Sequence, residues 1–151
     1  MEEKKKNGNI RISELGILSQ FAKNCEPGTS IFEIGAFDGR TTINLALNAP
    51  KSCVIYTLDL PPNTATKYSL ESGEQHFINK PETVLRYTKY QDIYREEISR
   101  IHQLLGDSAT FDYSEYNNSC SLVFVDGSHS YEYVKSDTKA AMALAKKGCV
   151  I

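Results

Sequence analysis

The chain has 151 residues, of which 40% are hydrophobic and 24% charged, and its formal net charge is −2. This length and apolar content suit one domain with its own core, so we expect a single domain over residues 1–151. The net charge excludes a protein that is basic throughout. The sequence also contains no basic stripe, so we expect no nucleic-acid partner. The one basic cluster, Lys4 to Lys6, falls within residues 1–10, which we expect to be disordered.

The sequence shows neither a secretory signal nor a membrane span. Its first residues are charged, no apolar segment follows them, and no apolar run approaches the ~20 residues that cross a bilayer. The four cysteines, at positions 25, 53, 120 and 149, lack C-x-x-C spacing. We therefore predict reduced, structural thiols in a cytoplasmic protein without a membrane partner.

Apolar runs alternate with helical patterns along the chain, which is typical of an α/β protein with a parallel sheet covered by helices. In chain order, we predict helix 12–23, strand 30–34, helix 41–48, strand 53–58, helical segment 90–100, strand 101–105, strand 122–125, helix 130–145 and a fifth strand beginning at 149.

The predicted helix 130–145 has an apolar stripe at helical spacing. The residues of this stripe are Val134, Thr138, Ala141 and Ala145. Lys146 and Lys147 suit the negative end of the helix dipole, and Gly148 suits the C-cap.

Residues 60–100 are the least regular part of the sequence and include Tyr87, Tyr90 and Tyr94. Two interpretations remain open for these tyrosines: half-buried packing, or the lining of a substrate entrance.

Each of the first four predicted strands ends in a polar or glycine-rich element. The first gives Glu33-x-Gly35-x-x-x-Gly39, and the others end at Asp59, Asp107 and Asp126. In open parallel sheets, ligands bind outside the carboxyl ends of the strands. The repetition over four strands therefore predicts a ligand site at this edge.

The spacing assigns a role to several of these residues. Gly35 and Gly39 allow a sharp turn into a helix and a close approach of the backbone to a ligand. Asp59 follows Gly35 by 24 residues, near the ~20-residue offset at which a carboxylate meets ribose hydroxyls. Asp107, with Ser108 beside it, suits an adenine amino group.

Two further carboxylates, those of Glu33 and Asp126, suit a ligand ammonium group, because they favour a nearby positive charge.

The glycine pattern argues against a nicotinamide cofactor. A dinucleotide requires G-x-G-x-x-G for contact with the pyrophosphate, whereas Phe37 stands at the second glycine and Asp38 would repel a phosphate. The pattern therefore favours a cationic nucleoside without phosphates, which is the chemistry of S-adenosylmethionine.

These segments resemble a known family. The run Phe32-Glu33-Ile34-Gly35-Ala36-Phe37-Asp38-Gly39 is similar to motif I of class I methyltransferases, and Thr57-Leu58-Asp59-Leu60 is similar to their second acidic motif. Leu105-Gly106-Asp107-Ser108 resembles their adenine-contacting strand end. The run from Leu122 to Glu132 resembles methyltransferase family 24, with its D-G-x-H-x-Y motif.

The resemblance implies a Rossmann-like three-layer α/β/α sandwich with a mostly parallel sheet in the order 3-2-1-4-5. It also implies S-adenosylmethionine as cofactor, with Asp126 near the transferred methyl group. The expected cofactor contacts are Glu33, Gly35, Ala36, Phe37, Gly39, Asp59, Leu60, Asp107, Ser108 and Asp126.

The sequence departs from the full family pattern at its C-terminal end. It stops at the fifth strand, so we predict a truncated fold without strands six and seven, with an exposed sheet edge through which two copies associate. In metal-dependent relatives Asp126 corresponds to one ligand, and the other ligands follow the fifth strand. A Mg²⁺ site is therefore incomplete in this sequence.

His129 has two interpretations: it lies in the turn that enters a helix capped by Ser128 or Ser130, or it acts as a base near an acceptor hydroxyl. Its place just beyond a strand end supports the second. His76 and His102 lack such a place, and we predict structural or exposed roles for both.

The leading hypothesis is methyl transfer to a small-molecule acceptor, at oxygen, with His129 and Asp126 as catalytic residues. The alternative is a module that binds the cofactor but is catalytically incomplete. A Rossmann-type oxidoreductase is disfavoured by Phe37 and Asp38.

Overall fold

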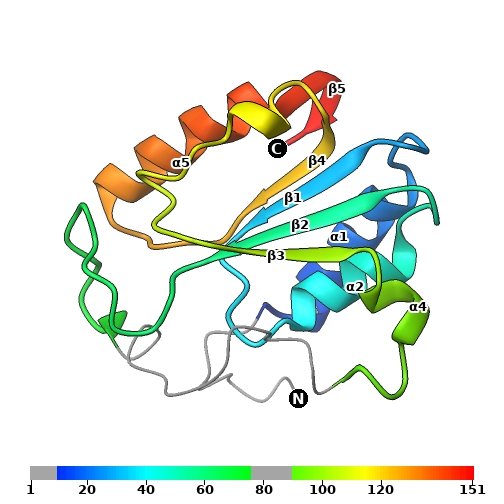
Figure 1. The fold of residues 1–151 in the computed structure, drawn as a ribbon, viewed down its shortest axis with the longest axis horizontal. Coiled ribbons are helices and arrows are strands. Elements are labelled where there is room, and N and C mark those ends of the chain that lie inside the picture. The colour runs from blue at the N-terminus through cyan, green and yellow to red at the C-terminus, as the bar shows by residue number, and fades with distance from the viewer. Residues whose placement is uncertain (1–9, 76–89) are drawn as a thin grey trace.

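The computed structural model describes residues 10–75 and 90–151, and its centre is a parallel sheet in the order β3-β2-β1-β4-β5 (Figure 1). This order confirms the prediction. The strands are β1 (Ser30–Ile34), β2 (Val54–Asp59), β3 (Ile101–Leu105), β4 (Cys120–Val125) and β5 (Ala145–Val150). Because all neighbouring pairs are parallel, the carboxyl ends of the strands lie along one edge of the sheet.

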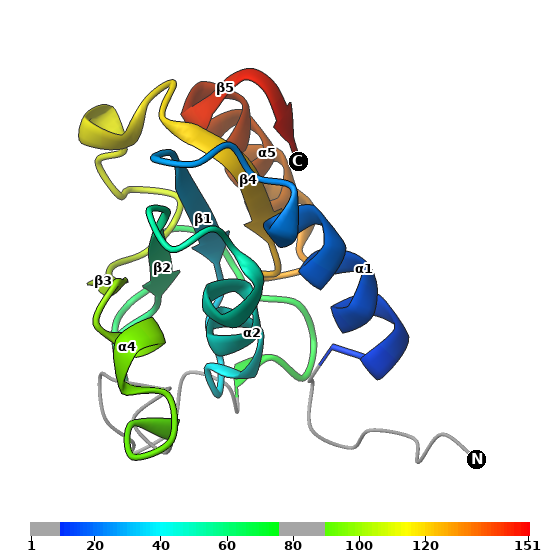
Figure 2. The same ribbon diagram turned by 90° about the vertical axis from the view of Figure 1, so that its right-hand side faces the viewer.

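Helices cover both faces of the sheet and produce the predicted three layers. On one face lie α1 (Ile12–Lys23), α2 (Arg40–Asn48) and the short α4 (Arg95–Ile98). On the other lies α5 (Tyr131–Leu144), and the 3-10 turn η2 (Ser114–Tyr116) precedes β4. Figures 1 and 2 show α1 beside α2, with α5 on the opposite side of the strands.

The apolar core is divided between these two faces by the alternation of side chains along β1. Ile31 packs into the cluster beneath α1 and α2, with Ile43 and Ile55. Phe32 and Ile34 pack into the opposite cluster, beneath α5. A strand that is buried on both faces reads as a continuous apolar run, which explains why this strand was recognisable in the sequence.

The predicted inner stripe of α5 was wrong by about one residue. The buried positions are Tyr133, Asp137, Ala141 and Leu144, so of the predicted stripe only Ala141 is buried. Val134 is 46% exposed. The helix turns its two bulky side chains, Tyr133 and Leu144, toward the sheet, and Asp137 is carried inward between them because it lies four residues after Tyr133.

The C-terminal end of α5 also differs from the prediction, because the helix stops at Leu144 and Gly148 does not cap it. The backbone amides of Asn118 and Ser119 donate to the carbonyls of Ala143 and Leu144 at 3.0 and 3.1 Å. These contacts satisfy the free carbonyls of the last turn. Ala145 then pairs with β4, so the following lysines belong to a strand at the edge of the sheet.

The segment 90–100 is less helical than predicted, since α4 covers only Arg95–Ile98. Tyr90 and Tyr94 pack against the core, which favours the packing interpretation for these two. Tyr87, His76 and the Lys4–Lys6 cluster lie outside the described residues. His102 is exposed on β3, with its ring 5.5 Å from that of Tyr56.

All four cysteines are free thiols, and three of them are buried. Within residues 10–75 and 90–151, no helix is long and apolar enough to cross a bilayer.

Candidate functional site

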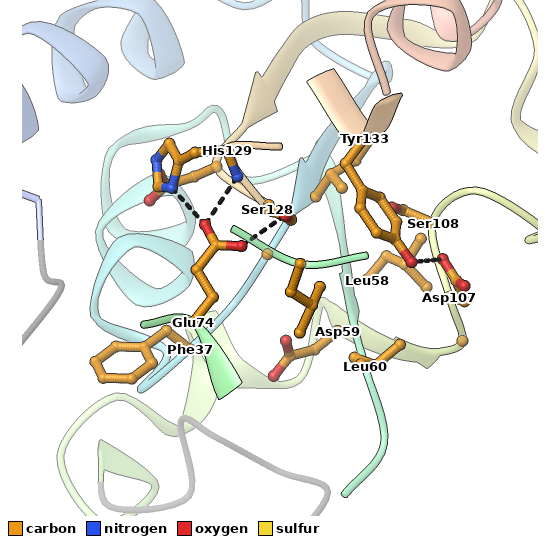
Figure 3. Close-up of a pocket in the computed structure, with 16 residues that line it drawn as sticks. Phe37, Leu58, Asp59, Leu60, Glu74, Asp107, Ser108, Ser128, His129 and Tyr133 are labelled. Carbon is orange, nitrogen blue, oxygen red and sulfur yellow. Dashed lines mark hydrogen bonds and ion pairs between the residues drawn. The ribbon is translucent and has the colours of Figure 1, made fainter. Parts of the chain in front are cut away.

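A cavity of about 170 Å³ lies at the carboxyl ends of β1, β2, β3 and β4 (Figure 3). Its lining comes from all four strand ends, from the segment after β2 and from the start of α5. The lining residues are Ile34, Gly35, Phe37, Leu58, Asp59, Leu60, Leu70, Glu74, Gly106, Asp107, Ser108, Asp126, Gly127, Ser128, His129 and Tyr133.

Most of the residues predicted for the site lie around this cavity. They are Gly35, Phe37, Asp59, Leu60, Asp107, Ser108, Asp126 and His129. Three predicted contacts, Glu33, Ala36 and Gly39, do not line it. Gly39 is the N-cap residue of α2, and Ala36 accepts its backbone hydrogen bond at 2.8 Å. Both therefore shape the loop behind the cavity wall.

The close approach between the ends of β1 and β4 requires a glycine at position 35. Its φ is +96°, and a Cβ at this position would lie 2.2 Å from the carbonyl oxygen of Asp126. The Gly35 amide donates to Leu58 at 2.8 Å, which ties the loop to β2 as well. Gly35 thus brings the ends of β1, β2 and β4 together at the cavity.

Phe37 stands where a dinucleotide motif has its second glycine, and its backbone has a conformation that is usual for glycine. Phe37 has a φ of +47°, in the left-handed region that side chains rarely adopt. Residues in this region concentrate at ligand sites, where the surrounding structure holds them. In Figure 3 the Phe37 ring points away from Asp59.

Glu33 lies beneath the cavity, fully buried in the core. Its Oε2 accepts hydrogen bonds from the hydroxyls of Thr42 at 2.5 Å and Thr57 at 2.6 Å. Burial raises the pKa of Glu33 to about 7 against the opposing effect of these two bonds, and the carboxylates of Asp126 and Asp59 raise it further. Its Oε1 is buried and has no hydrogen-bond donor.

The cavity has a strongly negative lining. Four carboxylates contribute to it, those of Asp59, Glu74, Asp107 and Asp126, and the described lining includes neither Lys nor Arg. Burial raises the pKa of Asp126 to about 6, while His129 lowers it and Glu14 raises it. A cationic ligand would relieve the repulsion among these carboxylates, whereas a phosphate would add to it.

The segment after β2 folds across the cavity. Leu70 and Glu74 contribute directly to its lining. At one end, the Lys67 amide donates to Asp107 Oδ2 at 2.6 Å, and the ring of Tyr68 lies 5.5 Å from that of Tyr133. This cover explains why the cavity is smaller than the roughly 300–1,000 Å³ usual for ligand pockets.

At the other end, Glu74 binds the turn between β4 and α5. Its Oε2 accepts from the Ser128 hydroxyl at 2.6 Å, and its Oε1 accepts from the His129 amide at 2.8 Å. The same Oε1 lies 2.8 Å from His129 Nδ1. Burial raises the pKa of Glu74, but the bonds from Ser128 and His129 outweigh it and the net shift is downward.

The contact with Glu74 assigns a hydrogen-bond role to one nitrogen of the His129 ring. An ionised carboxylate only accepts hydrogen bonds, so Nδ1 must carry the proton that it donates to Glu74. In the neutral ring, Nε2 then has a free lone pair. Nε2 is thus the ring nitrogen without a bond to Glu74, while Ser130 is the N-cap residue of α5.

Asp107 has a dense set of donors. Its Oδ1 accepts from the Tyr133 hydroxyl and from the Ala109 amide, both at 2.9 Å, and its Oδ2 accepts from Lys67. Burial, followed by the contact with Asp107, raises the pKa of Tyr133 to about 12. Tyr133 therefore remains a hydroxyl donor at neutral pH.

Sequence reasoning missed Glu74 and Tyr133. Tyr133 and Asp137 share a helix face four residues apart, so a stripe centred on the larger side chain would have included Tyr133. Glu74 had no local signal, because its partner Ser128 lies 54 residues away in the chain. The tyrosine of the D-G-x-H-x-Y motif, Tyr131, is 72% exposed and lies outside the cavity lining.

The described residues contain no group of three or more His, Cys, Asp or Glu side chains placed to hold a metal ion.

Comparisons with known proteins identify the family of the chain and agree with its fold. A family model described as a methyltransferase domain, methyltransferase family 24, matches residues 32–151. No curated protein matches the sequence significantly.

Solved structures share the fold at low sequence identity. A Corynebacterium glutamicum protein is 19% identical over 93% of this chain and 56% of its own, with a TM-score of 0.60. A Clostridium thermocellum protein described as a putative rRNA methylase is 15% identical over 91% of this chain and 65% of its own (TM-score 0.57).

A Geobacter sulfurreducens S-adenosylmethionine-dependent methyltransferase, solved with S-adenosylhomocysteine, is 13% identical over 98% of this chain and 49% of its own (TM-score 0.55). The chain thus spans about half to two thirds of the length of these three structures.

Proposed function

The chain belongs to methyltransferase family 24, a class I methyltransferase domain, and from this premise we propose that it binds S-adenosylmethionine at the strand ends and methylates a small molecule at oxygen. The observation that carries the proposal is the convergence of four carboxylates and the Gly35 loop on one cavity. This lining suits a cationic nucleoside and disfavours a pyrophosphate.

The lining residues suit the parts of this cofactor in turn. Asp59 would accept the ribose hydroxyls, with Leu60 and Ser108 beside the adenine. Asp107 would accept from the adenine amino group in place of the Lys67 amide, so the segment after β2 must shift on binding. Asp126, whose carboxylate interacts with that of Glu33, would attract the positively charged methionine end.

The charge of the site gives a pH-dependent test of the proposal. S-adenosylmethionine carries a sulfonium that S-adenosylhomocysteine lacks, and a cation lowers the pKa of neighbouring carboxyls. Asp126 and Glu33 are ionised above their pKa values of about 6 and about 7. At lower pH these carboxyls are protonated, and a bound cation must displace their protons. Affinity for the sulfonium should rise with pH through this window.

We expect the preference for S-adenosylmethionine over S-adenosylhomocysteine to decline roughly three- to tenfold from about pH 8 to about pH 5. Isothermal titration of both ligands across this range measures it. In Asp126→Asn the decline should be smaller, since one titrating carboxyl is gone. No binding of either ligand by the folded chain, or tighter binding of NADH, would refute the proposal.

The residues around His129 support proton removal from an acceptor hydroxyl. When bound, S-adenosylmethionine would supply a methyl group to the acceptor oxygen, whose lone pair forms the new bond while the sulfur keeps the electron pair of the broken carbon–sulfur bond. His129 Nε2 would take the hydroxyl proton, while Glu74 fixes the ring through Nδ1. Asp126 would stabilise the resulting imidazolium, because its carboxylate already interacts with His129.

Glu74→Ala tests this orientation of His129, because it removes the acceptor of the Nδ1 proton. We expect the ring to lose its preference for the Nδ1–H tautomer and to populate Nε2–H as neutral imidazole generally does. Long-range ¹H–¹⁵N spectra of the histidines measure the tautomer directly. Glu71→Ala, an exposed change in the same segment, is the control. An unchanged His129 tautomer in Glu74→Ala would assign Glu74 a purely structural role.

A further inference from the structure

A second cavity, of about 510 Å³, lies between α1 and the carboxyl end of β4. Its lining residues are Ile10, Glu14, Ile17, Leu18, Phe124, Asp126 and His129. Asp126 and His129 also line the cavity assigned to the cofactor, so the two cavities meet at these residues. The second cavity is within the size range of small-molecule sites.

We propose that this second cavity, named here the α1 cavity, binds the methyl acceptor, and that the acceptor is a hydrophobic alcohol or phenol without a negative charge. The inference rests on the proposed function and adds to it the place and the chemical class of the acceptor.

The position of the α1 cavity supports this assignment. A methyl acceptor must approach the donor from the side opposite the sulfur, so donor and acceptor need separate chambers that meet at the reacting groups. The shared residues are His129 and Asp126, which the mechanism already places beside the acceptor oxygen. Because Glu74 occupies Nδ1 of His129, the nitrogen left for an acceptor hydroxyl is Nε2.

The walls of the α1 cavity define the body of the acceptor. Four of its side chains are apolar: Ile10, Ile17, Leu18 and Phe124. Ile17 is 59% exposed, so burying it under a ligand removes apolar surface from water. A sugar would leave most of its hydroxyls against these walls without hydrogen-bond partners, which costs free energy. A hydrophobic body fits them better.

The charges of the α1 cavity define what the acceptor lacks. Glu14 and Asp126 both contribute carboxylates, and Glu14 is close enough to raise the pKa of Asp126. The described lining contains no Lys or Arg. A carboxylate or phosphate on the acceptor would face repulsion without a cationic partner, whereas a hydroxyl can donate to these groups.

Methyl NMR with three probes tests the site and its selectivity. The chain, labelled at Ile and Leu methyls and saturated with S-adenosylhomocysteine, is titrated with 4-ethylphenol, 4-ethylbenzoate and glucose. We expect 4-ethylphenol to shift the Ile17 and Leu18 methyls, and the other two probes to leave them in place. The Ile12 methyl, on the same helix but outside the lining, should not move.

Two pairs of variants extend the test. Ile17→Trp should fill the α1 cavity and weaken 4-ethylphenol binding at least tenfold, whereas Ile12→Trp, at another exposed position of α1, should not. Glu14→Gln keeps a side chain that can accept from the Arg11 amide, so the helix start is preserved. It should increase 4-ethylbenzoate binding, while Glu132→Gln, at the start of α5, should not.

The outcomes separate the inference from the proposed function. If S-adenosylhomocysteine moves the Leu58 and Leu60 methyls but 4-ethylphenol moves neither Ile17 nor Leu18, the acceptor site is wrong and the cofactor site stands. Equal binding of 4-ethylbenzoate and 4-ethylphenol in the unaltered chain overturns the chemical class. If S-adenosylhomocysteine itself does not bind, the proposed function fails, and this inference fails with it.

Discussion

Replacing Asp59 with alanine is expected to weaken S-adenosylhomocysteine binding by about a hundredfold or more. Asp59 lies at the end of β2 and lines the cavity proposed for the cofactor, beside Leu60. A carboxylate there would accept both ribose hydroxyls, and each hydrogen bond to a charged group contributes roughly 1.5–3 kcal/mol. Isothermal titration of the folded variant measures the loss.

Asp92→Ala removes the same charge from an exposed turn and serves as the matched control. Its affinity should equal that of the unaltered chain. The fold of Asp59→Ala should remain, because the backbone carbonyl of Asp59, not its side chain, accepts from the Gly106 amide. Unchanged affinity in a folded Asp59→Ala variant would remove the ribose contact on which the cofactor assignment depends.

The largest expected loss of stability comes from Gly35→Ala. The added Cβ would meet the Asp126 carbonyl oxygen at 2.2 Å and its carbonyl carbon at 2.7 Å. Both are backbone atoms at the end of β4, where the Asp126 amide donates to the Ile34 carbonyl at 2.8 Å, so neither can move aside without separating β1 from β4. The positive φ adds roughly 1–2 kcal/mol, and the overlap about as much again or more.

We therefore expect a loss of about 3–5 kcal/mol in the free energy of unfolding, measured by denaturant titration. Gly28→Ala provides the control, because Gly28 has a φ of +81° but a Cβ added there would meet nothing within 4 Å. It should lose only the backbone contribution of roughly 1–2 kcal/mol. Equal losses in the two variants would show that the contact with Asp126 does not limit this position.

The strands could be predicted from the sequence because their signals are local, whereas their order was implied by the family resemblance. β1 is a short apolar run followed by a glycine turn, and β4 is an apolar run followed by an aspartate. A chain with these alternating elements has few compact arrangements, and the resemblance to class I methyltransferases selected one of them. Because the strands are parallel, the residues that follow them were expected to meet at one edge of the sheet.

The rotation of α5 could not be predicted in this way. The sequence offers two stripes on the helix, one led by Val134 and one by Tyr133, and only packing against the sheet selects between them. The selected stripe buries Asp137, which a pattern based on hydrophobicity assigns to the surface. The same rotation brings Tyr133 to Asp107.

The sequence by itself determined the parallel α/β architecture, the glycine turn after β1 and the acidic residues at the strand ends, because neighbours along the chain encode each of these. Only the tertiary structure decided that Glu74 orients His129, and that α1 forms a second cavity beside Asp126. Both depend on residues that are distant in the chain and meet through packing, and no local pattern records such a meeting.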